Sequence, residues 1–288
     1  MTKVGVINYF VDEYHGTFFS QWLNEKSGGD VRVAYAYALA DSPPVDHPFP
    51  LRKRTTDQWC SDYGIEQCAS IEMLVSKSDA LMVCCPDYPE FHEQLCQLPL
   101  RSGKPTFVDK VFAPDFITAK RLFSLANEYN TPVYSCSALR FMAEFTDVNT
   151  DDIVDIAFWS GADDVHIIHQ IEPLMLLMKS KAKRLLCLLD GDYARYTVEF
   201  ADGRYASMAG YHVIKDTPLL ANIFHKDRHE TITVQSDIFH EFILKLADFL
   251  KTGDVKVKQE DTLDIIGVYE AAILSRQSSG TWINIRQQ

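Results

Sequence analysis

The sequence is poor in basic charge and has no long apolar run. It contains 28 lysine and arginine residues against 40 aspartate and glutamate residues, so its formal net charge is −12. Such a field repels phosphate backbones and anionic lipids, and we therefore expect neither nucleic acid nor a membrane as a partner. The most apolar run, Leu174 to Met178, is too short to span a bilayer, and no basic leader precedes the first strand-like run. The expected location is the cytoplasm.

Several sequence motifs typical of disulfide-rich, metal-binding or catalytic sites are also absent. The 7 cysteines are odd in number and show no C-x-x-C spacing, which argues against a disulfide framework or a zinc knuckle. Neither a G-x-S-x-G, a P-loop nor an H-E-x-x-H is present, so hydrolase and kinase functions have no support. Cys84-Cys85 lies inside an apolar run and is expected to be buried. The hydrophilic run from His225 to His229 is expected to be a solvated loop.

Short apolar runs alternate with amphipathic stretches along the first half of the chain. Strands are predicted at residues 4–7, 31–37, 80–85, 105–108 and 132–134, and helices at residues 17–25, 71–76, 91–98 and 114–130. Strands separated by helices imply right-handed crossovers and a parallel sheet. The first half is therefore predicted to be a Rossmann-type, doubly wound α/β domain.

The pattern changes after about residue 139. Strands are predicted at residues 195–200, 205–208 and 231–235, with a hairpin signal at Asp202-Gly203, and helices at residues 239–249 and 264–275. Alternation and a hairpin turn are typical of antiparallel pairing. We expect a first domain over residues 1–138 and an α+β domain with a mostly antiparallel sheet over residues 139–288.

The ends of the predicted parallel strands are where a ligand would bind. A doubly wound sheet binds ligands beyond the carboxyl ends of its strands, at the point where the strand order reverses. The residues that follow the strands are Asn8 onward, Tyr37 onward, Pro86-Asp87-Tyr88 and Asp109-Lys110. A partly desolvated lysine at such a place polarises a hydroxyl or carbonyl oxygen or shuttles a proton. The alternative for Lys110 is an ion pair with Asp109 or another carboxylate.

A second group of polar residues contains His166 and His169, which share a helix face if a helix has begun by then. Asp163, Asp164 and Glu172 are close by in the sequence. The spacing suits a metal site, or His169 as a general base. A third alternative has both histidines hydrogen-bonded at a domain interface.

The segment from Asp79 to Ala113 reads DALMVCCPDYPEFHEQLCQLPLRSGKPTFVDKVFA. A resemblance to a known family depends on the order and spacing of these residues: Asp79, Pro86, His92, Gly103-Lys104 and Lys110. In that order and spacing, the segment resembles the oxidoreductases related to glucose-fructose oxidoreductase and inositol dehydrogenase, the Gfo/Idh/MocA family. The likeness continues past Arg140 and returns in the closing helices and strand of the chain.

The resemblance implies an NAD(P)-dependent oxidoreductase acting on a sugar, polyol or related hydroxy compound. Gly161, Val165 and His169 match the family's G-x-x-x-D-x-x-x-H segment, with valine in place of the aspartate. Lys110 would polarise the substrate oxygen, and His169 would take its proton as hydride leaves for nicotinamide. Arg140 and His166 would join them around the small-molecule substrate. By the same resemblance, the second domain binds substrate and forms a homodimer or a higher homo-oligomer.

The chain departs from the family where a dinucleotide would bind. Asn8, Phe10 and Glu13 stand where glycines let the backbone approach the pyrophosphate. A phenylalanine fills that space, and a carboxylate competes with pyrophosphate for the helix N-terminus. Tyr37 stands about where an acidic residue would bind the ribose. The family has an E-K-P motif whose lysine corresponds to Lys110, and here Asp109 and Val111 replace its glutamate and proline.

Two functions therefore stay open. A rebuilt cofactor site would draw on the following residues: Asn8, Tyr9, Phe10, Tyr37, Pro86, Asp87 and Asp109. The alternative is a non-catalytic family member that serves as a small-molecule-binding or regulatory module, which the loss of the glycines and of the aspartate favours.

Overall fold

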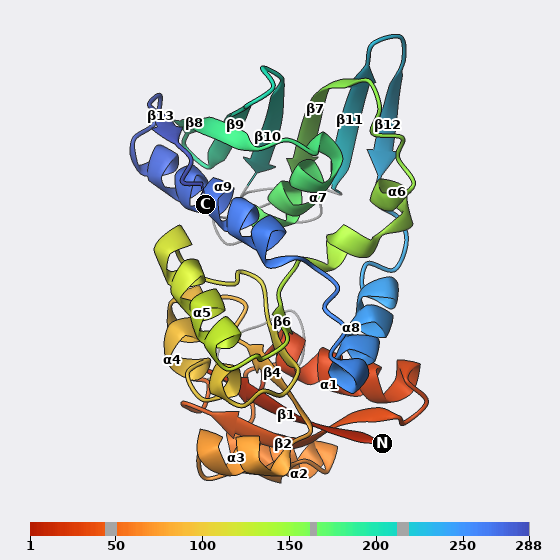
Figure 1. The fold of residues 1–288 in the computed structure, drawn as a ribbon, viewed down its shortest axis with the longest axis vertical. Helices are drawn as coiled ribbons and strands as arrows, with labels where there is room; N and C mark the ends of the chain where they lie inside the picture. The colour runs from red at the N-terminus through yellow and green to blue at the C-terminus, as the bar shows by residue number, and fades with distance from the viewer. Residues whose placement is uncertain (44–50, 162–165, 212–218, 288) are drawn as a thin grey trace. The chain divides into compact units, whose positions relative to one another are not determined.

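The computed structural model describes residues 1–43, 51–161, 166–211 and 219–287 (Figure 1). Its contacts divide the chain into two compact units. The first contains residues 1–113, 117–135 and 243–259, and the second contains residues 114–116, 136–242 and 260–288. The chain thus returns to the first unit after it has built most of the second.

The first unit is built on a parallel sheet of six strands in the order β3-β2-β1-β4-β5-β6. The strands are β1 (Thr2–Asn8), β2 (Val31–Ala38), β3 (Glu66–Gln67), β4 (Ala80–Cys84), β5 (Thr106–Val108) and β6 (Val133–Tyr134). The doubly wound sheet predicted from the sequence is confirmed. The strand order reverses between β1 and β4, where Asn8 pairs with Cys84, so the ligand-binding edge lies beyond these two residues.

The helices of this sheet are α1 (Tyr14–Lys26), α2 (Thr56–Tyr63), α3 (Ile71–Lys77), α4 (His92–Leu95), α5 (Phe116–Glu128) and α8 (His240–Thr252). The single helix predicted over residues 91–98 is wrong. It is divided into α4 and two 3₁₀ turns, Pro89–Phe91 and Pro99–Arg101, each of which begins at a proline. Proline favours the first position of a helical turn because it has no N–H to donate there.

Helix α2 was missed by the sequence prediction, although its ends carry a signal. Thr55 accepts the N–H of Gln58 at 3.2 Å, and the side chain of Gln58 accepts the N–H of Thr55 at 3.0 Å. Gly64 ends the helix with a φ of 63°. A capping box followed by glycine at positive φ is the pattern by which such a short helix is recognised.

The core of the first unit is built on the central strands, whose buried residues are mostly apolar because helices cover both faces of the sheet. Every residue of β4 is buried, and so is the run from Val4 to Asn8 in β1. Cys84 and Cys85 belong to this core with 0% and 1% of their surface exposed, as expected. Among the described residues, no helix is both long and apolar enough to cross a membrane.

The second unit contains a sheet of seven strands in the order β12-β11-β7-β10-β9-β8-β13. Its strands are β7 (Ile153–Ser160), β8 (Ala182–Asp190), β9 (Tyr193–Phe200), β10 (Tyr205–Tyr211), β11 (Leu220–His225), β12 (His229–Thr233) and β13 (Trp282–Asn284). All pairs are antiparallel except β7 with β10. This confirms the mostly antiparallel second sheet.

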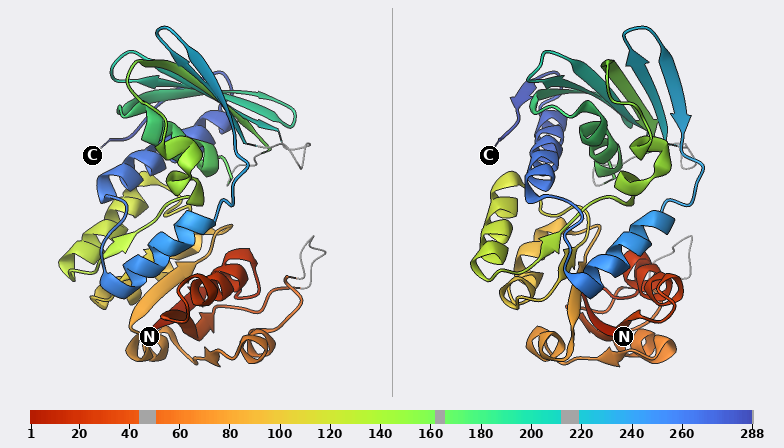
Figure 2. Two further views of the ribbon diagram at one scale, coloured as in Figure 1. Left: turned by 90° about the vertical axis from the view of Figure 1, so that its right-hand side faces the viewer. Right: turned by 45° about the vertical axis from the view of Figure 1, so that its right-hand side comes forward.

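One face of this second sheet is covered by helices α7 (Ile168–Met178) and α9 (Gln259–Gln277), as both views of Figure 2 show. Short turns at Ala138–Phe141 and Ala143–Thr146 (α6) precede the sheet in the chain. The covered face is apolar, with Phe158, Met208 and Ile223 at 1%, 1% and 0% exposure. Alternation along each strand leaves the opposite face open.

Within the run from His225 to His229, residues 226–228 form an exposed loop, as the sequence suggested, but the two end residues belong to strands. His225 ends β11 and His229 begins β12, so the two strands form a tight hairpin. His225 is buried, with Nε2 2.9 Å from the Glu230 carboxylate. β11 extends to His225 because it pairs with both β7 and β12. The hydrophilic sequence around His225 does not predict this strand end, because it depends on the distant partner β7.

Candidate functional site

The turn between β1 and α1 lies at the ligand-binding edge of the parallel sheet. Glu13 is the N-cap of α1, and its carboxylate accepts the N–H of His15 at 2.8 Å and that of Gly16. The side-chain amide of Asn8, at the end of β1, donates to the same carboxylate at 2.8 Å. The N-terminus of a helix favours an anion because its free N–H groups and the helix dipole point the same way. Here a carboxylate of the chain itself takes that position.

Aromatic side chains fill the space beside this turn. The Tyr9 ring lies 4.4 Å from both Phe10 and Phe91 and 5.5 Å from Tyr88, measured between ring centroids. The Arg52 guanidinium lies 5.6 Å from the centre of the Phe10 ring. The surrounding residues leave a cavity of only about 10 Å³. A single water molecule already needs roughly 10–15 Å³ of such space.

A second carboxylate holds the segment that follows the β2 strand over this turn. Asp12, 1% exposed, accepts the backbone N–H groups of Lys53 at 2.8 Å and Arg54 at 2.9 Å. The Arg54 guanidinium donates to its other oxygen at 2.8 Å, and the N–H of Arg52 donates to the Asp12 carbonyl at 3.0 Å. These bonds cover the turn with residues 51–54.

Asp109 and Lys110 follow β5 directly, as predicted, and are 1% and 4% exposed. The Asp109 carboxylate accepts the N–H of Lys110 at 2.8 Å, and its second oxygen lies 2.6 Å from Nδ1 of His15. Asp109 thus pairs with the His15 imidazole and not with the Lys110 ammonium. In the part of the chain that the structure describes, no carboxylate lies within ion-pair distance of that ammonium. The Lys110–Val111 peptide bond is cis.

The protonation of Glu13 is perturbed by its surroundings. Burial raises its pKa from 4.5 to about 7, because the charged carboxylate has lost its water. The His15 imidazole opposes this rise, the Asp109 carboxylate adds to it, and the N–H groups of Gly16 and His15 oppose it. Glu13 therefore titrates close to neutral pH.

The predicted cofactor residues partly gather around this turn. Asn8, Tyr9, Phe10, Pro86 and Asp87 all line the small cavity. Asp109 reaches the turn through His15. Tyr37 lies in β2, where it pairs with Ile7, and is not part of the cavity lining.

In the second unit, His169 lies in the first turn of α7. Its Nδ1 is 2.7 Å from Oγ of Ser137, a fully buried residue that follows β6 in the chain. His166 precedes the helix, and its carbonyl accepts the N–H of His169 at 3.0 Å. The helix has thus not yet begun at His166, but the two imidazole rings still lie 5.8 Å apart. Ser137 was missed as a site residue, and the strand-end argument that found Lys110 would have found it.

The described residues contain no group of three or more His, Cys, Asp or Glu side chains able to hold a metal ion. Asp163, Asp164 and Val165 lie outside the described residues.

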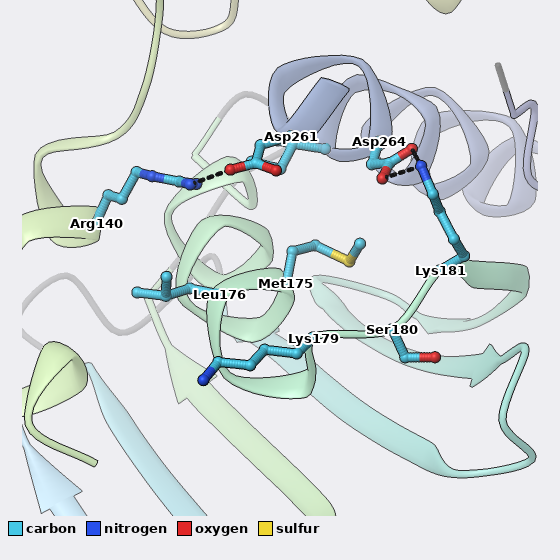
Figure 3. Close-up of a pocket in the computed structure, with 9 residues that line it drawn as sticks. Arg140, Met175, Leu176, Lys179, Ser180, Lys181, Asp261 and Asp264 are labelled. Atoms are coloured by element: carbon cyan, nitrogen blue, oxygen red, sulfur yellow. Dashed lines mark hydrogen bonds and ion pairs between the residues drawn. The ribbon is translucent and has the colours of Figure 1, made fainter. Parts of the chain in front are cut away.

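Arg140 bridges two carboxylates of the second unit. Its guanidinium donates to Glu172 at 2.9 Å and to Asp261 at 2.5 Å. Burial raises the pKa of Glu172, and the Arg140 charge opposes this rise. Figure 3 shows Arg140 and Asp261 beside the ion pair of Lys181 with Asp264, all lining a cavity of about 350 Å³. Arg140 thus shapes a polar cavity as well as the buried network around Glu172.

The fold defines a class of protein with a nucleotide-binding type of parallel sheet and a second, mostly antiparallel unit. Residues 48–136 match the model of the Gfo/Idh/MocA family, described as an oxidoreductase family with an NAD-binding Rossmann fold. This match covers the segment whose motifs resemble the family and supports the resemblance found in the sequence. No curated protein matches the sequence.

Solved structures share the fold over nearly the whole chain. A myo-inositol 2-dehydrogenase from Lactobacillus plantarum is 14% identical, with a TM-score of 0.78 and 99% of each chain covered. A scyllo-inositol dehydrogenase from Lactobacillus casei with bound NAD(H) and scyllo-inositol is 14% identical, with a TM-score of 0.77 and 98% of each chain covered. A UDP-N-acetylglucosamine 3-dehydrogenase from Acidithiobacillus ferrooxidans is 14% identical, with a TM-score of 0.76, 96% of this chain and 97% of that chain covered.

The family implies a dinucleotide, but the turn after β1 does not fit a pyrophosphate in this conformation. The amides of His15 and Gly16 are bonded to Glu13, and Phe10 lies in the turn beside a cavity of about 10 Å³. A diphosphate is far larger than the single water that such a space could hold. The turn would have to open before a dinucleotide could bind there in the usual way.

Proposed function

We propose that this chain is an oxidoreductase of the Gfo/Idh/MocA type that acts on a sugar, polyol or related hydroxy compound, with NAD or NADP as its cofactor. The observation that carries the proposal is the buried Lys110 directly after β5, at the ligand-binding edge and inside the segment matched by the family. The three neighbours named above are dehydrogenases of inositols and of a nucleotide sugar. A hydroxyl-bearing carbon is the feature that these substrates share.

The roles of the chain's own residues follow from their chemistry. The Lys110 ammonium donates to the substrate oxygen and polarises it. His169 moves the proton of the substrate hydroxyl, and Ser137 holds the imidazole through Nδ1. Ser137 is thus the partner of His169 where the family pattern has an aspartate. Arg140 and His166 complete the proposed substrate residues.

The alternative of a non-catalytic binding module has no support from the comparisons, because the matched family and the named neighbours are oxidoreductases.

Residues 1–138 are the proposed nucleotide-binding-like domain. Residues 139–288 are the proposed substrate and dimerisation domain. The cytoplasm is the proposed location, supported by the 7 cysteines, which are all buried and form no disulfide.

A homodimer formed through the open face of the second sheet is also proposed. Trp159, Tyr205 and Phe224 are 40%, 46% and 43% exposed. The pairing register places all three on the face opposite the helices, since Trp159 pairs with Ala209 and with Leu220. Exposed aromatic side chains on one sheet face are typical of an interaction surface.

The test is turnover of a panel of polyols, sugars and nucleotide sugars with NAD and with NADP. We expect Lys110→Ala to lower kcat/KM by about 10²–10⁴-fold on any substrate that the wild type accepts. Lys245→Ala, which removes an exposed lysine of α8 in the same unit, should leave turnover unchanged. Equal rates for the Lys110→Ala variant and the wild type would remove this lysine from the reaction.

A further inference from the structure

The N-terminus of α1 is bonded to a side chain of the chain itself. In a Rossmann fold the amides of this first helix turn hold the pyrophosphate. Here the amides of His15 and Gly16 donate to Glu13, whose carboxylate also accepts from Asn8. Glu13 is 6% exposed, so these three donors serve a group that water hardly reaches. The chain's carboxylate therefore makes the bonds that a phosphate oxygen would make.

The backbone is closed tightly around this carboxylate. A Cβ added to Gly16 would lie 2.7 Å from the Val11 carbonyl, 2.9 Å from Oε1 of Glu13 and 3.1 Å from Nδ2 of Asn8. Real Cβ atoms do not approach so closely, so glycine is needed at this position. Its role is to let the first turn of α1 lie against the preceding loop with the carboxylate of Glu13 between them.

Two further contacts keep the turn closed. Phe10 packs against Tyr9 and beneath the Arg52 guanidinium, which places an aromatic ring where the family has a glycine. Asp12 binds Arg54 through both its backbone and its guanidinium. The segment that covers the turn thus contributes cations that are already paired or stacked within the unit.

We propose that Glu13 is a built-in occupant of the pyrophosphate position, and that a dinucleotide binds in the family's manner only after this carboxylate has left the N-terminus of α1. The inference rests on the proposed function, since it concerns the cofactor of that same site. Binding must displace three hydrogen bonds to Glu13 and move Phe10 out of the turn. Dinucleotide affinity is therefore held down by these two side chains.

The ionisation of Glu13 adds a pH dependence to this competition. The titratable and charged groups around it are the following: His15, Asp109, Cys84, Cys85, Arg52, Asp87, Tyr9 and Tyr88. Its own pKa is about 7, so the carboxylate gains its full charge as the pH rises past neutrality. An ionised carboxylate repels pyrophosphate and a protonated one does not. Dinucleotide affinity should therefore fall as the pH rises from 6 to 8.

The experiment is calorimetric titration of the full chain with NAD⁺ and NADP⁺, comparing the wild type with Glu13→Gly and Glu13→Gln. Glycine is nearly as good an N-cap as an acidic residue, so the fold should survive, and a thermal melt checks it. We expect Glu13→Gly to bind at least about tenfold more tightly than the wild type. Glu25→Gln, at an exposed position near the other end of α1, removes the same charge and should bind like the wild type.

The Glu13→Gln variant keeps a capping side chain and removes only the titration. Its affinity should be nearly constant from pH 6 to pH 8, whereas that of the wild type should weaken about threefold to tenfold over this range. Parallel pH profiles for the two proteins would overturn the inference, even if the glycine variant failed to fold.

The remaining outcomes separate the two proposals. If the wild type binds a dinucleotide as tightly as Glu13→Gly does, the inference is wrong and the proposed cofactor stands. If folded Glu13→Gly and the double variant with Phe10→Gly both fail to bind either dinucleotide, the proposed function is wrong and the inference falls with it.

Discussion

At the scale of single residues, Glu13 is the side chain in the least ordinary position. A buried carboxylate is costly unless it is hydrogen-bonded, and this one accepts from Asn8, His15 and Gly16. Those bonds do not cancel the loss of water, since the pKa is still raised to about 7. The residue thus stabilises the helix through its cap and weakens the folded state through its charge.

This balance predicts a pH-dependent stability. The pKa of Glu13 is higher in the folded chain than its ordinary value of 4.5, so its favourable contribution is fully present below pH 4.5 and is lost as the pH rises through about 7. The loss amounts to at most about 3 kcal/mol in the free energy of unfolding. Urea denaturation of the wild type and of Glu13→Gln from pH 4.5 to pH 8 measures it. The wild type should lose more stability than the variant over this range, and equal losses would contradict the raised pKa.

At the scale of elements, the connection after β2 is attached to the turn after β1 by Asp12. This carboxylate is 1% exposed and its partner Arg54 is 21% exposed, so the pair is largely shielded from water. A second carboxylate, Asp62, also faces Arg54 at 3.5 Å but is 58% exposed. The Arg54 guanidinium therefore faces one buried carboxylate, Asp12, and one exposed carboxylate, Asp62. Substituting each in turn separates the effect of burial from that of charge.

We expect Asp12→Asn to lower the free energy of unfolding by about 1–3 kcal/mol, because it removes a charge that accepts from two amides and a guanidinium. Asp62→Asn should change it by less than about 0.5 kcal/mol, as exposed ion pairs contribute little. Chemical denaturation at pH 7 compares the two variants. Equal changes in the free energy of unfolding of the two variants would mean that burial of Asp12 does not strengthen its interactions.

At the scale of the whole molecule, the second sheet presents a face that the helices of its own unit do not cover. Alternation in the strands places apolar side chains inward and leaves Trp159, Tyr205 and Phe224 outward. A sheet with one apolar and one mixed face is suited to pairing with a second copy.

If the chain is a dimer through this face, Trp159→Glu should convert it to a monomer, because a desolvated charge at an interface costs several kcal/mol. Sedimentation velocity measures the change directly. Leu274→Glu places the same charge at an exposed position of α9, 41% exposed in the wild type, and should leave the dimer intact. A wild type that sediments as a monomer would end the dimer proposal.

Much of the architecture could be predicted because its signals are local. Buried strands such as β4 read as apolar runs, and α5 and α8 show helical periodicity. Elements whose signals come from distant partners were missed or misplaced. The hairpin of β11 and β12 depends on pairing with β7, and the start of α7 at Ile168 leaves His166 before the helix.

The candidate site divides in the same way. The sequence by itself determined the resemblance to the family, the position of Lys110 just after a strand, and the presence of Asn8, Phe10 and Glu13 where the family has glycines. These depend on residue type and spacing, which are properties of the chain as written. Only the tertiary structure decided that Asp109 pairs with His15, that Ser137 holds His169, and that Glu13 bonds to the first amides of α1. Such contacts depend on which groups the fold brings together, and burial in this site raises the pKa of Glu13.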